Sequence, residues 1–145
     1  MKASTQIEAI QELLIHLQKL EILSFTSNLF SYINNKEKML PCAAEHGIAY
    51  PHSTSIEIEE LTCVLGISKI GIDFNSPDGQ LYHLFLLTLS LNNNPYEHQK
   101  FITHFRTIFN DYNVRSYLLD ATESNDVINI VQKWEKNDSL TNNLN

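Results

Sequence analysis

The segment from Leu81 to Leu91 is an almost uninterrupted apolar run, and it constrains the fold more than any other stretch of this sequence. Its apolar residues occupy even and odd positions alike, so both faces of a strand formed here must be covered. That pattern is typical of a central strand with helices on either side. We therefore predict an α/β fold, and 145 residues suit a single domain with a substantial core.

Amphipathic stretches on both sides of this run predict helices. The first begins at a capping box in which Thr5 and Glu8 each satisfy a backbone donor of the other residue. Its apolar side chains then recur at helical spacing, at Ile7, Ile10, Leu13, Leu14, Leu17 and Leu20. Further helices are expected at 26–38, after the Asn94-Pro95 pair, at 113–119 and from Ser124. The polar residues 137–145 are expected to form a disordered tail behind a domain of residues 1–136.

Two further segments complete the predicted sheet. Leu61 to Ser68 is expected to form a strand, with Cys63 in the core. The tripeptide Pro77-Asp78-Gly79 predicts a turn before the central strand, because proline fixes φ and glycine accepts positive φ. The short apolar piece 48–50, bounded by Gly47 and Pro51, is interpreted as a loop that feeds a short strand.

Charge and composition exclude several classes of protein. The formal net charge of −7 argues against a general nucleic-acid binder, which needs clustered Lys and Arg. No apolar run is long enough to cross or insert into a membrane, and the N-terminus does not read as a secretory signal. The spacing of Cys42 and Cys63 fits neither a disulfide framework nor a zinc site. We therefore expect a cytoplasmic protein.

Among the histidines, position in the predicted elements singles out two. His52 follows Pro51 where a short strand meets a polar loop, a place that suits a reactive side chain. His98 lies in the first turn of a predicted helix, where free backbone donors favour anions. Together they could cradle a phosphoryl group if the fold unites them, although both could equally be solvated. His16 and His104 are expected on helix surfaces, and His83 as a hydrogen-bonded imidazole of the central strand.

With these residues in view, the chain resembles the type-2 EIIA domains of the bacterial phosphoenolpyruvate-dependent sugar phosphotransferase system, the fructose, mannitol and nitrogen-regulatory group. The likeness extends from about Thr5 to Trp134, and the 46-position interval between His52 and His98 matches the family's two active-site histidines. Three motifs carry it together with the apolar strand before His98: Lys36-Glu37-Lys38, Gly47-Ile48-Ala49-Tyr50-Pro51-His52 and Gly71-Ile72-Asp73-Phe74-Asn75-Ser76-Pro77-Asp78-Gly79. The resemblance implies a mixed β-sheet flanked by helices on both faces.

The resemblance also implies a function. His52 would accept a phosphoryl group from the phosphohistidine of HPr and pass it to an EIIB partner, as a histidine phosphotransferase in sugar uptake or its regulation. His98 would be the second active-site histidine, and Lys36 would stabilise charge. The implied neighbours of the phosphoryl site are Cys42, Ser53 and Thr54. No cofactor and no metal is implied, and a dimer is possible.

The sequence departs from the family pattern at several points. Lys36 stands where relatives usually carry Arg, and it keeps the charge without the planar guanidinium fork. Cys42 replaces a Thr, and Glu45 adds a negative charge within the altered loop 41–46. The family's leading strand before the first helix is missing, so a sheet edge or an apolar face would be exposed or covered by a partner.

These departures keep alternative hypotheses open. The first is a regulatory, nitrogen-regulatory-type module on the same fold that has lost phosphotransfer, or that acts by binding a regulatory partner. A second makes Glu45, His46 and His52 a metal site, although their spacing matches no familiar ligand pattern. A third makes Cys42 a nucleophile, which lacks an evident base other than His46.

Overall fold

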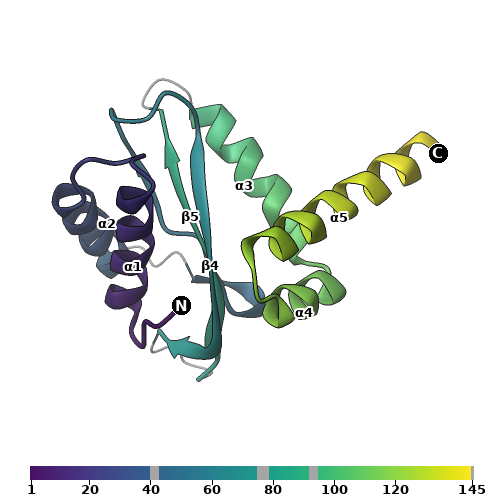
Figure 1. The fold of residues 1–145 in the computed structure, drawn as a ribbon, viewed down its shortest axis with the longest axis horizontal. Helices are drawn as coiled ribbons and strands as arrows, with labels where there is room; N and C mark the ends of the chain where they lie inside the picture. Colours follow the sequence, from purple (N-terminus) through teal and green to yellow (C-terminus); the bar gives the residue numbers. More distant parts are fainter. Residues whose placement is uncertain (40–42, 75–78, 92–94, 145) are drawn as a thin grey trace. The chain divides into compact units, whose positions relative to one another are not determined.

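The computed structural model describes residues 1–39, 43–74, 79–91 and 95–144, and the chain divides into two compact units, residues 1–99 and 100–145. The first unit holds helices α1 (Gln6–Lys19) and α2 (Ser27–Met39), every strand, and the first turn of α3 (Pro95–Phe109). The second holds the rest of α3, α4 (Tyr112–Asp120) and α5 (Ser124–Leu144) (Figure 1). The mixed α/β class predicted from the sequence is confirmed.

The sheet is built around β5 (Leu81–Ser90), as predicted. The long strand β4 (Thr62–Asp73) pairs antiparallel along one edge of β5. The short strands β2 (Ile48–Ala49) and β3 (His52–Thr54) pair parallel with β5 along its other edge. β1 (Ala43–Ala44) pairs antiparallel with β2, and a single 3-10 turn, η1 (Glu45–Gly47), joins these two strands. The sheet is therefore mixed, as the resemblance implies.

Strands β2 and β3 follow one register along β5 and are separated only at residues 50–51. Ile48 lies opposite Leu84, His52 opposite Thr88, and the same offset continues to the end of β3. Pro51 interrupts the ladder because it has no N–H to donate, yet its carbonyl still accepts from the Thr88 N–H at 3.0 Å. This continuous register places His52 beside Thr88, close to the C-terminal end of β5.

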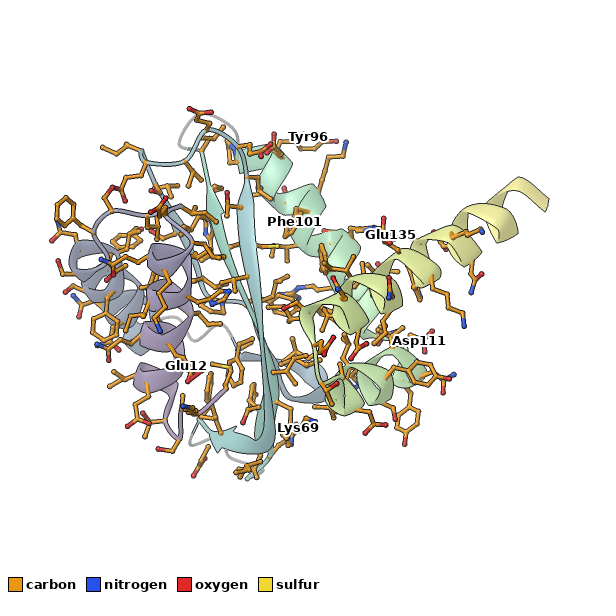
Figure 2. All side chains as sticks on the ribbon, in the orientation of Figure 1. Glu12, Lys69, Tyr96, Phe101, Asp111 and Glu135 are labelled. Atoms are coloured by element: carbon orange, nitrogen blue, oxygen red, sulfur yellow. The ribbon has the colours of Figure 1, made fainter. Side chains whose placement is uncertain are left out.

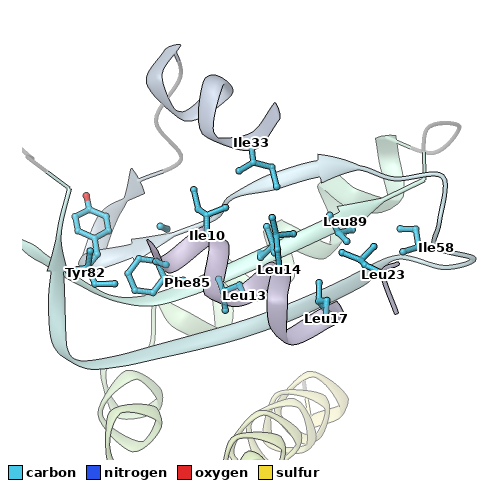
Figure 3. Close-up of a cluster of buried hydrophobic side chains, with 14 residues drawn as sticks. Ile10, Leu13, Leu14, Leu17, Leu23, Ile33, Ile58, Tyr82, Phe85 and Leu89 are labelled. Atoms are coloured by element: carbon cyan, nitrogen blue, oxygen red, sulfur yellow. The ribbon is translucent and has the colours of Figure 1, made fainter. Parts of the chain in front are cut away.

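One face of the sheet carries the core under α1 and α2, which lie on the same side of β4 and β5 (Figure 1). Four apolar side chains of α1 pack there against residues of β5 (Figure 3): Ile10, Leu13, Leu14 and Leu17 from the helix, and Tyr82, Phe85, Leu87 and Leu89 from the strand. Helix α2 contributes Ile33, which is fully buried among the described side chains of this helix. The cluster consists of Ala9, Ile10, Leu13, Leu14, Leu17, Leu23, Ile33, Ala49, Ile58, Ile72, Tyr82, Phe85, Leu87 and Leu89.

The N-terminal residues run beside the outer edge of β4. The Met1 backbone nitrogen donates to the Ile67 carbonyl at 2.9 Å, and Thr5 forms an isolated parallel bridge with Asp73. Glu12 of α1, labelled in Figure 2, accepts hydrogen bonds from the backbone N–H groups of residues 2 and 3. No strand precedes α1 among the described residues, but part of the edge that the sequence left open is occupied by residues 1–5.

The predicted capping box forms at the start of α1. The Thr5 hydroxyl accepts from the Glu8 N–H at 3.2 Å, and the Glu8 carboxylate accepts from the backbone N–H and hydroxyl of Ser4. Hydrogen bonds from the Ser4 backbone, then from its side chain, lower the pKa of Glu8 below its ordinary value.

Local hydrogen bonds fix the helix ends of the second unit. Asp111, labelled in Figure 2, caps α4 by accepting from the Asn113 and Val114 N–H groups. The Arg115 guanidinium donates to the Phe109 carbonyl at 2.8 Å and so closes the turn between α3 and α4. The fully or largely buried side chains of this unit are Ile108, Phe109, Val114 and Leu118.

Two expectations from the sequence are wrong. Cys63 is exposed and is not a core residue; its register partner is Thr88, so it shares the face of the sheet opposite the α1 core. Residues 137–144 are not a disordered tail, because α5 continues through them to Leu144.

The predicted turn at Pro77-Asp78 lies outside the described residues. Within the described part of the chain, no helix is long and apolar enough to cross a membrane.

Candidate active site

The site is built where β3 begins and β5 ends. His52 is the first residue of β3, directly after Pro51, and its side chain is half-buried. Its Nε2 atom lies 2.8 Å from the hydroxyl of Ser90, the last residue of β5. Because the parallel register places Ser90 opposite Thr54, this contact joins side chains on one face of two neighbouring strands.

His98 supplies the second ring from the first turn of α3. Its imidazole stacks on that of His52, with ring centroids 3.6 Å apart and planes 17° from parallel. Both residues belong to the compact unit of residues 1–99. The two histidines that the sequence singled out, 46 positions apart, therefore lie in direct contact.

The remaining predicted site residues differ in where they lie relative to the histidine pair. Thr54 lies on the same face of β3 as His52, by strand alternation, and is exposed. Ser53 points to the opposite face beside the register position of Leu89, and its hydroxyl donates to the Thr54 carbonyl at 3.0 Å, so the structure does not bring it to the histidine pair. Lys36 lies within α2, but its side chain is outside what the structure describes, as is the whole of Cys42.

Two hydroxyl residues beside His52 were missed by the sequence analysis. Ser90 is 2% exposed and contacts the His52 ring, and Thr88 is fully buried on the same face of β5. The Thr88 hydroxyl has no hydrogen-bond partner within the described part of the chain. The signal was present, because residues 84–90 are apolar except at positions 88 and 90, which share one face of the strand.

The other histidines lie apart from this pair. His16 and His104 are exposed on α1 and α3, as expected. His83 is half-buried on β5, and its Nδ1 atom lies 2.8 Å from the Ser68 carbonyl, which confirms the expected hydrogen-bonded imidazole. His46 has a left-handed backbone with φ of 65°, and the side chain of Glu45 is not described. Among the described residues, no three His, Cys, Asp or Glu side chains gather into a metal-binding group.

The arrangement has the elements of a phosphoryl-accepting site. An imidazole that carries a lone pair is a nucleophile near neutral pH, and His52 is restrained in its plane by Ser90 and across its face by His98. The first turn of α3 adds backbone donors and the positive end of a helix dipole near His98. Transfers of this kind depend mainly on positioning and charge stabilisation.

Comparison with known proteins identifies the family. The sequence profile described as "Phosphoenolpyruvate-dependent sugar phosphotransferase system, EIIA 2" matches residues 1–134 and so spans both compact units. The chain is 27% identical over 104 residues to the PTS system fructose-specific EIIABC component of Bacillus subtilis (strain 168). That match covers 72% of this chain but only 16% of the larger protein.

Solved structures show the same fold. Nitrogen regulatory protein IIA-Ntr from Neisseria meningitidis superimposes with a TM-score of 0.78 at 20% identity, over 90% of this chain and 88% of that one. IIA mannitol from Escherichia coli gives a TM-score of 0.74 at 22% identity, over 90% and 91% of the two chains. From the profile match along nearly its whole length, the chain belongs to the type-2 EIIA family of the phosphoenolpyruvate-dependent sugar phosphotransferase system.

Proposed function

We propose that this chain is a phosphocarrier in which His52 accepts a phosphoryl group from the phosphohistidine of an HPr-like protein and passes it to an EIIB-type partner. The observation that carries the proposal is the stacked pair of His52 and His98, whose ring centroids lie 3.6 Å apart. Membership of the EIIA family supports the same chemistry.

Each site residue has a role in this proposal. His52 is the nucleophile, and His98 holds its ring by stacking and donates to the oxygens of the transferred group. Lys36 supplies positive charge from α2, and the Thr54 hydroxyl is a neighbour of the phosphoryl group. Cys42, which lies outside the described residues, keeps the role of phosphoryl-site neighbour that the family motif implies. Ser53 takes no direct part, since its side chain lies on the other face of β3.

The partners follow from the same chemistry. The solved complex of enzyme IIA mannitol with phosphorylated enzyme IIB mannitol from Escherichia coli, which shares this fold at 22% identity, supports an EIIB-type acceptor. The fructose-specific relative supports a place in sugar uptake or its regulation. Both proposed partners act on the inner side of the membrane, so we place this chain in the cytoplasm.

The test is reconstitution with phosphoenolpyruvate, enzyme I and HPr. A carrier acquires one acid-labile phosphoryl group, loses it when an EIIB domain is added, and fails to acquire it as His52→Ala. His16→Ala is the matched control, because that histidine is exposed on α1 far along the chain from the pair and should be phosphorylated normally. A wild-type chain that stays unmodified while a reference EIIA is phosphorylated contradicts the proposal.

A regulatory module is the second candidate. The likeness to nitrogen regulatory protein IIA-Ntr, with a TM-score of 0.78, and the altered loop 41–46 favour it. Such a module binds its target whether or not His52 can be phosphorylated. Pull-down with the wild type and with His52→Ala separates the two functions: equal capture of one regulatory protein, without phosphorylation of the wild type, supports the module.

A further inference from the structure

Helix α5 leaves its apolar side chains only partly covered. Five large apolar residues lie in its described part, and none of them is buried. The preceding helix α4 differs, since its Val114 and Leu118 side chains are 5% and 0% exposed. Because helices in proteins are stabilised mainly by packing of an apolar face, α5 has apolar surface available for a further contact. The five residues are Val127, Ile128, Ile130, Val131 and Trp134.

Part of this surface lines a groove between α4 and α5, the last two helices of the second unit (Figure 1). The groove has a volume of about 710 Å³, and the exposed ring of Tyr117 lines its α4 side. Trp134 lies on the α5 side, and His104 of α3 contacts its ring edge-on, with ring centroids 6.1 Å apart. The α5 residues of the groove recur every three or four positions and so share one side of the helix: Asp126, Asn129, Ile130, Lys133, Trp134 and Asn137.

This side of α5 carries two opposite charges that its own chain leaves without an ion pair. Neither Asp126 nor Lys133 forms a salt bridge within the described part of the chain. The Asp126 carboxylate accepts hydrogen bonds from the backbone N–H groups of residues 122 and 123, which lower its pKa below the ordinary value and keep it ionised at neutral pH. Seven positions separate the two charges, which is about 10 Å along a helix.

A second copy of the same face would satisfy both charges at once. If two α5 helices pack antiparallel about a two-fold axis midway between positions 126 and 133, each Asp126 faces the partner's Lys133. Asn129 and Ile130 then lie beside the axis. A parallel arrangement would set like charges against each other, and a partner of uniform charge would repel one of the two residues. The charge pattern therefore favours a second copy of this chain in the antiparallel register.

We propose that the α4–α5 groove is the interface of a two-fold symmetric homodimer, in which antiparallel α5 helices bury Trp134 and pair Asp126 of each copy with Lys133 of the other. Aromatic side chains are typical anchors of such interfaces, and charges at their rim set the partner and the register. The interface goes beyond the phosphocarrier function, and neither member of the histidine pair takes part in it.

The first measurement combines the molecular mass with the fluorescence of Trp134. This residue is the only tryptophan of the chain, so its emission reports on the groove alone. Sedimentation equilibrium should give twice the mass of one chain, and the emission should shift to shorter wavelength as the protein is concentrated, with the same midpoint. A monomer throughout the concentration range overturns the proposal, and so does a dimer that leaves the emission of Trp134 unchanged.

The second measurement tests the pairing of charges. Lys133→Glu sets a like charge against Asp126 of the other copy twice, and should weaken the dimer by about 30-fold or more. Asp126→Lys should weaken it in the same way. An equimolar mixture of the two variants should form heterodimers of wild-type strength, because each supplies the charge that the other has lost. Glu135→Lys is the matched control, since this residue lies on the opposite side of α5 and is not part of the groove.

A further variant separates the interface from the folding of α5. Circular dichroism shows whether Asp126→Lys is folded, because Asp126 holds the backbone N–H groups that precede the helix. Asp126→Asn keeps an acceptor oxygen for them, and adding it to Lys133→Glu should strengthen the dimer at least about fivefold over Lys133→Glu alone. Dimers of Lys133→Glu as strong as the wild type, no gain from Asp126→Asn, or folded charge-reversed variants that stay monomeric when mixed would each overturn the proposal. An assembly larger than two copies would do so as well, because a two-fold interface closes at the dimer.

Discussion

Replacing His98 by alanine tests the contact on which the proposed site depends. The substitution removes the stack on His52, whose centroids are 3.6 Å apart, and the proposed donor to the phosphoryl oxygens. Aromatic stacking contributes about 0.5–1.5 kcal/mol and a hydrogen bond to a charged group about 1.5–3 kcal/mol. Together these contributions of about 2–4.5 kcal/mol predict a transfer rate roughly 30- to 2,000-fold below that of the wild type.

Two further variants divide this loss between its causes. His98→Phe keeps an aromatic ring for stacking without a donor, and His98→Gln keeps a donor without the stack, so each should fall between alanine and the wild type. His104→Ala on the same helix is the control, since that imidazole is exposed and lies outside the pair.

The assay is rapid-quench measurement of phosphoryl transfer from phospho-HPr, with circular dichroism to confirm that each variant is folded. The reasoning is refuted if folded His98→Ala transfers within about twofold of the wild type, because neither the stack nor a donor then contributes. Equal loss in His104→Ala would show that the effect belongs to the helix and not to the ring that touches His52.

Three further predictions concern the fold around the site. Phe85 lies in the centre of β5 and is 1% exposed, so Phe85→Ala should lower the free energy of unfolding, measured by urea titration, by about 3–5 kcal/mol. A loss below about 1 kcal/mol would contradict the central placement of β5. Gly47→Ala should lower the melting temperature, because φ at this position is +68° and the added Cβ would lie 2.7 Å from the Leu81 carbonyl oxygen. The expected cost in stability is at least about 1–2 kcal/mol. An unchanged melting temperature would be incompatible with that backbone conformation. Desolvation by neighbouring protein atoms raises the pKa of the Cys63 thiol, so in a Cys42→Ser background its alkylation should accelerate at higher pH than that of free cysteine. The same pH midpoint as free cysteine would disprove the shift.

The elements whose signals are local were predictable. The apolar run of β5, the capping box at Thr5 and Glu8, and the Pro95 start of α3 each depend on a few neighbouring residues, and each appears where expected. The family resemblance added the pairing of His52 with His98, which no local rule contains because 46 positions separate the two. Contacts of that sequence separation depend on the whole topology.

The errors and omissions arise because strand register and helix length depend on other segments of the chain, which a single segment does not reveal. Alternation along β4 divides its residues between the two faces of the sheet, but it does not say which face carries the core. Pairing with β5 decides this, and it places Cys63 on the same face as Thr88. Ser90 was overlooked because a serine in an apolar strand can have many structural roles. Its contact with His52 could be expected only once the register between β5 and β3 was known. The polar residues after 136 have weak helix propensity, yet they continue a helix that has already been nucleated upstream.

The most direct test of the account is to locate the phosphate after the chain has been charged with phosphoenolpyruvate, enzyme I and HPr. Tandem mass spectrometry at neutral pH, with electron-transfer fragmentation that preserves phosphohistidine, assigns the modified residue among the six histidines. The account predicts a single phosphoryl group on His52, with none in His52→Ala. A phosphate on any other histidine, or an uncharged chain beside a charged reference EIIA, would contradict it.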